Sequence, residues 1–148
     1  LNTTVGTTNR VEVYNPTTDT LTLGGLIVAD SGGQVTAAMM SGEIAPGAYR
    51  VFATSAASAS NGGLMNAIAF NLALNNGGDR VQLRRGNTII DEVTWAMGWP
   101  GADGVAICLR APYGDNSLVA SWGTSVGTYG PNPDTGSPGV ASNATNCP

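Results

Sequence analysis

The sequence Asp134-Thr135-Gly136-Ser137 is the first segment that could do chemistry. In this pattern two aspartates about 3 Å apart share one proton and act as an acid–base pair. The chain carries one copy, so a pair would need a second chain. Pro131, Pro133 and Pro138 flank the segment and predict a rigid surface loop. We therefore interpret it as a loop and not as a catalytic site.

Other catalytic patterns lack a required partner. Gly123 to Gly127 matches the G-x-S-x-G nucleophile elbow, but the chain has no histidine to act as the base. Asp91 and Glu92 are adjacent, and neighbours in a strand point to opposite faces, so they cannot flank one glycosidic bond together. We expect no enzyme activity and no catalytic residues. A glycosidase assembled from distant acids is the alternative.

The chain also has few residues of the types that bind metals or cofactors. Without histidine, and with two distant cysteines, the chain lacks the usual zinc ligands. Calcium held by Asp103, Asp115 or Asp134 with backbone oxygens is one hypothesis, and hydrogen bonding within turns is the other. We expect no cofactor.

Cys108 and Cys147 are the two cysteines. If they are bonded, closing a loop of about 40 residues stabilises the fold by roughly 3 to 4 kcal/mol. Two free thiols are the alternative. The chain begins at Leu1, as a chain trimmed of a signal peptide would, and an oxidising compartment fits a disulfide. These features predict a secreted or cell-surface protein.

Aromatic residues concentrate in the second half of the chain, and most are expected to pack in the core. Trp99, followed by Pro100 in a predicted loop, is our candidate for an exposed partner contact. An exposed ring can stack on a sugar or bury in a protein partner. The aromatic residues concerned are Trp95, Trp99, Tyr113, Trp122 and Tyr129.

Composition excludes two classes of partner. The net charge is −4 with a pI near 4.4, which argues against nucleic acid because phosphate binding needs a clustered basic face. No run of 18 apolar residues is present, so no membrane span is predicted. Charged residues make up 11% of the chain, against about 25% in an average soluble protein. Neutral polar residues must therefore cover the surface, as in secreted or surface-assembled proteins.

Seven short segments with alternating or β-branched residues predict an all-β sandwich of antiparallel strands. In the last of them Val105, Ile107 and Leu109 point inward and Cys108 points outward. The stretch 123–148 is rich in Gly, Pro, Ser, Thr and Asn, so we expect a coil that wraps the sandwich within a single domain, 1–148. The predicted strands are 10–14, 20–30, 49–54, 67–74, 80–85, 88–95 and 104–110.

Several segments, among them 21–30, resemble parts of the lamin tail domain family. Residues 11–17 (VEVYNPT) resemble its "EIYNPT" opening, and residues 44–49 resemble its "IPAGGYLV" segment. Residues 78–83 followed by 90–95 resemble "GDTVTLL…VDSVTY", and residues 136–143 resemble the bacterial "GTPGAPN" close. The resemblance implies an immunoglobulin-like sandwich that acts as a binding or structural accessory module, with no catalytic residues to carry over.

The family's first strand, an "INEV"-like segment before "EIYNP", has no clear counterpart, because Thr3 to Thr8 are weakly apolar. A sandwich that lacks a strand leaves unpaired backbone groups beside its core. A neighbouring copy could fill this slot by strand addition, which would build a fibre or layer. The leading hypothesis is therefore a self-assembling extracellular module. The alternative is a monomeric accessory module that binds carbohydrate or a protein partner.

Overall fold

Short strands make up most of the regular structure in the computed structural model, which describes residues 2–5, 9–33, 39, 41–71, 73–111, 113–131 and 134–148. Its two helical turns are the 3-10 segments η1 (Ser58–Ser60) and η2 (Val119–Ser121). The strands are β1 (Asn2–Val5), β2 (Arg10–Tyr14), β3 (Leu21–Thr22), β4 (Leu26–Asp30), β5 (Glu43–Ile44), β6 (Tyr49–Ala53), β7 (Ile68–Ala69), β8 (Gly78–Arg85), β9 (Thr88–Ala96), β10 (Val105–Leu109) and β11 (Trp122–Thr124).

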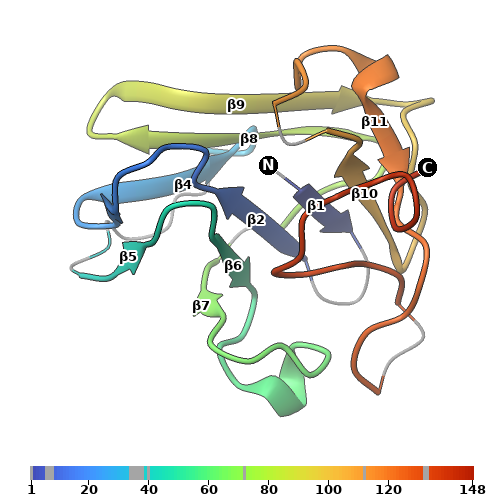
Figure 1. Ribbon diagram of the computed structural model, residues 1–148. Coiled ribbons are helices and arrows are strands. Elements are labelled where there is room, and N and C mark those ends of the chain that lie inside the picture. Colours follow the sequence, from blue (N-terminus) through green and yellow to red (C-terminus); the bar gives the residue numbers. More distant parts are fainter. Residues whose placement is uncertain are drawn as a thin grey trace.

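The strands form two main sheets. One sheet has six strands in the order β11-β10-β1-β2-β6-β7, and the other has three in the order β4-β8-β9. In Figure 1 the three-stranded sheet runs along the top, with the six-stranded sheet below it. A separate pair, β3-β5, completes the arrangement. The predicted all-β, immunoglobulin-like class is confirmed, and β7 departs from the antiparallel pattern because it pairs in parallel with β6.

The core lies between the sheets because successive side chains of a strand point to opposite faces, and the apolar ones of each sheet point toward the other sheet. Val11 and Val13 on β2 are buried, as are Val81 and Leu83 on β8. The inward positions predicted for Ile107 and Leu109 on β10 are confirmed, since both join the same cluster. The other buried members are Leu23, Leu26, Val28, Ile44, Phe52, Phe70, Leu74, Val93, Trp95 and Trp122.

Strand β9 contains a bulge next to Asp91. Leu83 pairs with Asp91 and Arg84 with Ile89, so Ile90 has no partner on β8. Asp91 thus faces the same side as the buried Leu83, at the edge of the sheet, where Asn116 Nδ2 donates to its carboxylate at 2.8 Å. The buried-side carboxylate keeps a hydrogen-bond partner, as its burial requires.

Two predicted strands are shorter than their sequence patterns suggested. The segment 20–30 divides into β3 and β4 around a turn at Gly24 and Gly25, where Gly25 adopts a φ of +74° that favours glycine. Within 67–74 the strand is limited to β7, and Leu72 lies outside the described residues.

The prediction that the first strand is missing is wrong. β1 lies between β2 and β10 and pairs with both: Thr3 is opposite Val11 on one side and Ile107 on the other. The ladder consists of backbone hydrogen bonds, so a polar segment can supply it, and threonine suits a strand. Residues 6–8 of the stretch lie outside the described residues.

The C-terminal segment forms a coil against the six-stranded sheet after the short β11. Ser125 N–H donates to the Ala106 carbonyl at 2.8 Å, and Ala106 N–H donates to the Thr135 carbonyl at 3.2 Å. Further along, Gly139 N–H donates to the Glu12 carboxylate on β2. The segment therefore covers the outer face of β10 and β2. No helix in the described part of the chain is long and apolar enough to span a membrane.

Candidate interaction surfaces

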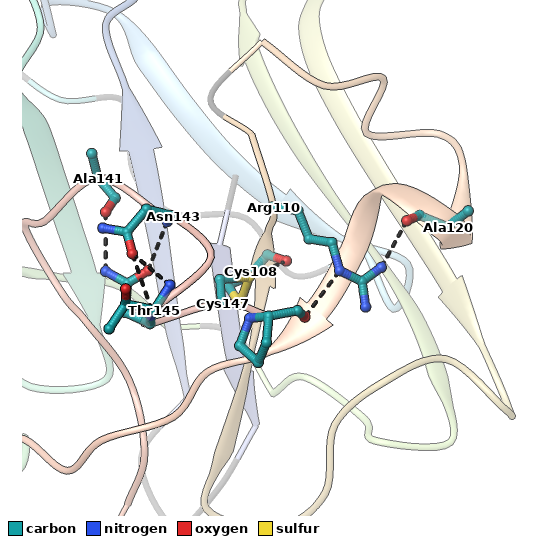
Figure 2. Close-up of a disulfide and its surroundings, with 9 residues drawn as sticks. Cys108, Arg110, Ala120, Ala141, Asn143, Thr145 and Cys147 are labelled. Atoms are coloured by element: carbon teal, nitrogen blue, oxygen red, sulfur yellow. Dashed lines mark hydrogen bonds between the residues drawn. A yellow bond between two sulfur atoms is a disulfide. The ribbon is translucent and has the colours of Figure 1, made fainter.

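The predicted disulfide is present between Cys108 and Cys147, whose Cα atoms lie 6.0 Å apart. Cys108 sits on β10 beside Ile107, on the face turned away from the core, where the C-terminal segment covers it. Figure 2 shows the bridge joining that segment to the strand. Both cysteines are buried, so the bond is shielded from solvent.

Hydrogen bonds around the disulfide hold the end of the chain in place. Arg110 Nε donates to the Pro148 carbonyl at 2.9 Å, and Arg110 donates through Nη1 to the Ala120 carbonyl at 2.8 Å. Asn143 Oδ1 accepts from the backbone N–H of Thr145 and Asn146, which closes the small loop seen in Figure 2. These contacts make the bridge part of an ordered structure.

A buried ion pair replaces the acid–base chemistry considered for Asp134. Arg10 Nη2 lies 3.0 Å from Asp134 Oδ2, with side-chain exposures of 4% and 11%. Arg10 also donates to the Asn61 carbonyl at 3.2 Å and lies 4.4 Å from the centre of the Tyr129 ring. The pair fastens β2 to the C-terminal segment. A carboxylate bound to a guanidinium is a poor proton carrier, so this arrangement supports a structural role.

Burial lowers the pKa of Arg10, and the charge of Asp134 and its hydrogen bond offset only part of that effect. The guanidinium stays charged at every accessible pH because its ordinary value is so high. Removing Asp134 would therefore leave a buried cation without its counter-charge, which is costly.

Each aspartate proposed as a calcium ligand has a protein partner. Asp103 accepts from Asn76, and Asp115 accepts from the Ser117 hydroxyl and backbone N–H. The Ser117 hydroxyl is the main cause of a lowered pKa of Asp115. Among the residues that the structure describes, no group of three or more histidine, cysteine or carboxylate side chains lies close enough to hold a metal ion.

Trp99 is not the exposed aromatic that its loop position suggested. It is half-buried and packs against the main core, 6.0 Å from Trp122 in ring-centre distance. Trp95 and Trp122 are buried, in line with the expected core role of most aromatic residues. The exposed ring is Tyr113, with 76% of the residue accessible.

Tyr113 belongs to a cluster of three tyrosines, which we call the tyrosine cluster: Tyr14 on β2, Tyr49 on β6, and Tyr113 itself. Tyr14 and Tyr49 face each other in the register and stack at 4.6 Å, and Tyr113 meets Tyr14 edge-on at 6.2 Å. Burial, followed by the nearby Tyr14, raises the pKa of Tyr49 to about 12. A hydrogen bond with Tyr113 raises the pKa of Tyr14. The phenols of Tyr14 and Tyr49 are therefore neutral at physiological pH.

A groove of about 430 Å³ adjoins this cluster, because Tyr49 is also one of its lining residues. We call it the β6 groove. Sequence reasoning missed this surface because Tyr14 and Tyr49 lie 35 positions apart, and only the β2–β6 pairing brings them together. The other lining residues are Arg50, Val51, Gly63, Leu64, Met65, Asn66, Tyr129, Gly130, Pro138 and Gly139.

A second groove, of about 610 Å³, opens between β3, β5 and the β8–β9 hairpin. Its lining is mostly apolar and includes the exposed Leu21 and Ile90, with Arg85 at its rim. Arg85 donates to the Thr22 carbonyl at 2.8 Å, which ties the hairpin to β3.

Comparison with known proteins finds one family. The model of the Lamin Tail Domain family matches residues 2–97, which span β1 to β9. No curated protein and no solved structure matches the chain. Both cysteines and Asp134 lie beyond the matched residues, although β10 and β11 continue the same sheet. Since the match covers well over half of the sequence, the chain belongs to the lamin tail domain family, a non-enzymatic family of immunoglobulin-like fold.

Proposed function

We propose that this chain is a non-catalytic extracellular module that links copies of itself into a surface fibre or layer by exchanging β1. The observation that carries the proposal is the position of β1, which is bonded on both sides, to β2 and to β10. An interaction role agrees with family membership. The exchange of β1 between copies is our proposal for how this interaction takes place.

The β1 slot must be filled for the core to stay covered. Val11 and Ile107, which flank the slot, are 0% and 6% exposed. Moving β1 away would open the sheet beside both residues and leave two strands with unpaired edges. The same bonds form whether β1 comes from the same chain or from another copy, which is the energetic basis of strand exchange.

Other edges are poor sites for strand addition. β3, β5, β7 and β11 have two or three residues each. β9 has nine, but it contains the bulge at Ile90 and the inward-facing Asp91, two features that discourage edge pairing. β4 is the other edge strand of the three-stranded sheet. Met39 covers the start of this edge, because it exchanges backbone hydrogen bonds with Gly25 and Leu26. This comparison favours the β1 slot over the edges.

The extracellular location is supported by the buried disulfide and the low charge. Disulfides persist in oxidising compartments and are rare in the cytosol. Only 11% of the residues are charged. A neutral polar surface reduces repulsion between copies, which suits close packing in an assembly.

A cysteine trap tests the exchange directly. Val5 and Val105 are register partners, and Cα atoms of such partners lie about 4.5 to 5.5 Å apart, within the range of a disulfide. The double variant Val5→Cys/Val105→Cys, oxidised after secretion, should give a ladder of covalent oligomers on a non-reducing gel. A covalent product that is exclusively monomeric would refute the exchange.

A matched control uses Arg80→Cys with Thr94→Cys, register partners within the β8–β9 hairpin. Because the two strands of a tight hairpin stay in one chain, this bond should form only within monomers. Oligomers from the control would show thiol scrambling. Light scattering and negative-stain imaging of the unmodified protein should show concentration-dependent polymers.

A second candidate function is a monomeric accessory module that binds a carbohydrate or a protein partner. The exposed ring of Tyr113, next to the stacked Tyr14 and Tyr49, favours it. A monomer in the trapping and scattering experiments would make this the leading function.

A further inference from the structure

The β6 groove has the dimensions of a small-molecule site. Its volume of about 430 Å³ falls within the usual range of roughly 300 to 1,000 Å³. The groove is lined by Val51 on β6, by a first wall of residues 63–66 and by a second wall of Tyr129, Gly130, Pro138 and Gly139, and the two walls meet where Gly63 approaches Gly130. These walls come from distant parts of the sequence, and the Arg10–Asp134 pair and the disulfide hold the second one in place.

The tyrosine cluster extends this groove with aromatic surface. Tyr49 lines the groove and stacks on Tyr14, which in turn contacts Tyr113. Tyr113 is 76% exposed, so most of its ring meets solvent. Tyr129 adds another ring to the lining, although one of its faces is used by Arg10. A ligand in the groove would therefore meet rings as well as polar backbone.

The lining has no acidic residue and one cation, Arg50, whose Nη2 donates to the Glu43 carbonyl at 2.8 Å. The other polar groups of the lining are neutral. The phenols of Tyr14 and Tyr49 are neutral and can donate or accept hydrogen bonds. A sugar presents C–H faces to aromatic rings and hydroxyl groups to polar atoms, so it matches both kinds of surface.

We propose that the β6 groove and the tyrosine cluster together bind a neutral oligosaccharide, with Tyr113 as the stacking platform. This inference deepens the second candidate function and does not depend on exchange of β1. The site is a binding site alone, because the lining offers no pair of carboxylates for glycoside cleavage.

Titration calorimetry with cellotetraose, chitotetraose and maltotetraose tests the proposal on the full chain. At least one of them should bind with a Kd of about 1 mM or tighter. Tyr113→Ala should weaken that binding about 5-fold or more, the loss expected for one stacked ring. Tyr113→Phe, which keeps the ring, should retain most of the affinity. Met97→Ala removes a side chain that is exposed elsewhere, and it should bind like the unmodified protein.

Amide shift mapping by NMR then locates the ligand. Bound sugar should shift the amides of Val51, Met65 and Gly139, which line the groove, and leave those of the β8–β9 hairpin in place. The proposal is overturned if none of the three sugars binds at millimolar concentration. It is equally overturned if binding survives Tyr113→Ala unchanged or maps away from the groove. Such a failure would leave the cysteine-trap result untouched, so the two proposals fail separately.

Discussion

Replacing Asp134 by asparagine should destabilise the protein strongly, because it leaves the Arg10 guanidinium buried without a counter-charge. Breaking a buried ion pair on one side costs about 3 to 5 kcal/mol. Arg10 keeps the Asn61 carbonyl and the Tyr129 ring, so we expect a value near the lower limit, about 3 kcal/mol. With a urea m-value of about 2 kcal/mol/M, the unfolding midpoint should fall by about 1.5 M.

Tryptophan fluorescence is a suitable readout because Trp95 and Trp122 are buried and become exposed on unfolding. The double variant Arg10→Met/Asp134→Leu removes both charges together. It should be more stable than Asp134→Asn alone, since an apolar pair of similar volume carries no uncompensated charge. The double-mutant cycle then gives the coupling between the two residues.

Glu92→Gln is the matched control. Its ion-pair partner Arg80 lies 3.8 Å away, and both side chains are more than a third exposed, at 37% and 40%. The Glu92 carboxylate also accepts from Gln82 Nε2 at 2.5 Å, a bond that the amide oxygen of glutamine can still accept. An exposed pair of this kind contributes about 0 to 1 kcal/mol, so the control should change stability little. A loss below about 1 kcal/mol for Asp134→Asn would place the Arg10 pair in the same class and refute the reasoning from burial.

Three further predictions concern the disulfide and two titrating groups. Cys108→Ser with Cys147→Ser should lower the free energy of unfolding by about 4 kcal/mol, because a separation of 39 residues sets the lost loop-closure entropy; a urea melt of the double variant checks this. At Asp79, burial alone raises the carboxyl pKa, but hydrogen bonds from Ser31, Arg80 and Asn75 outweigh it, and the pKa is lowered. The stability from this carboxylate is present above about pH 4 and lost as the pH falls through the lowered pKa, so the stability difference between the unmodified protein and Asp79→Asn should shrink in acid melts. Tyr49, with a pKa raised to about 12, contributes stability that is complete below about pH 10 and lost as the pH rises through 12; alkaline melts of Tyr49→Phe should lack that part of the decline.

The C-terminal segment forms part of the surface outside the residues that the family model matches. The family match ends at residue 97, yet the disulfide and the Arg10–Asp134 pair fasten residues beyond it to β10 and β2. One wall of the β6 groove comes from that segment. The sandwich thus serves as a scaffold, and residues beyond the family match shape the groove that we propose as a binding site.

The strands that carry strong alternation could be predicted from the sequence. In β2 and β8 the valine and leucine residues of the core recur every second position, so side-chain direction follows from backbone geometry alone. The disulfide could also be predicted from the sequence. The chain has two cysteines, and Cys108 points outward because its neighbours Ile107 and Leu109 point inward. The absence of histidine excluded a serine–histidine site without any structure.

Tertiary structure alone decided the surfaces. β1 is polar, and its pairing with β2 and β10 depends on backbone groups that leave no apolar pattern. The position of Trp99 beside Pro100 predicted an exposed ring. Instead, the ring packs against Trp122, which lies 23 residues further along the chain, and Trp99 is half-buried. The tyrosine cluster and the Arg10–Asp134 pair join residues that are far apart in the sequence. Local patterns report which face of a strand is buried, whereas long-range pairing determines which residues become neighbours.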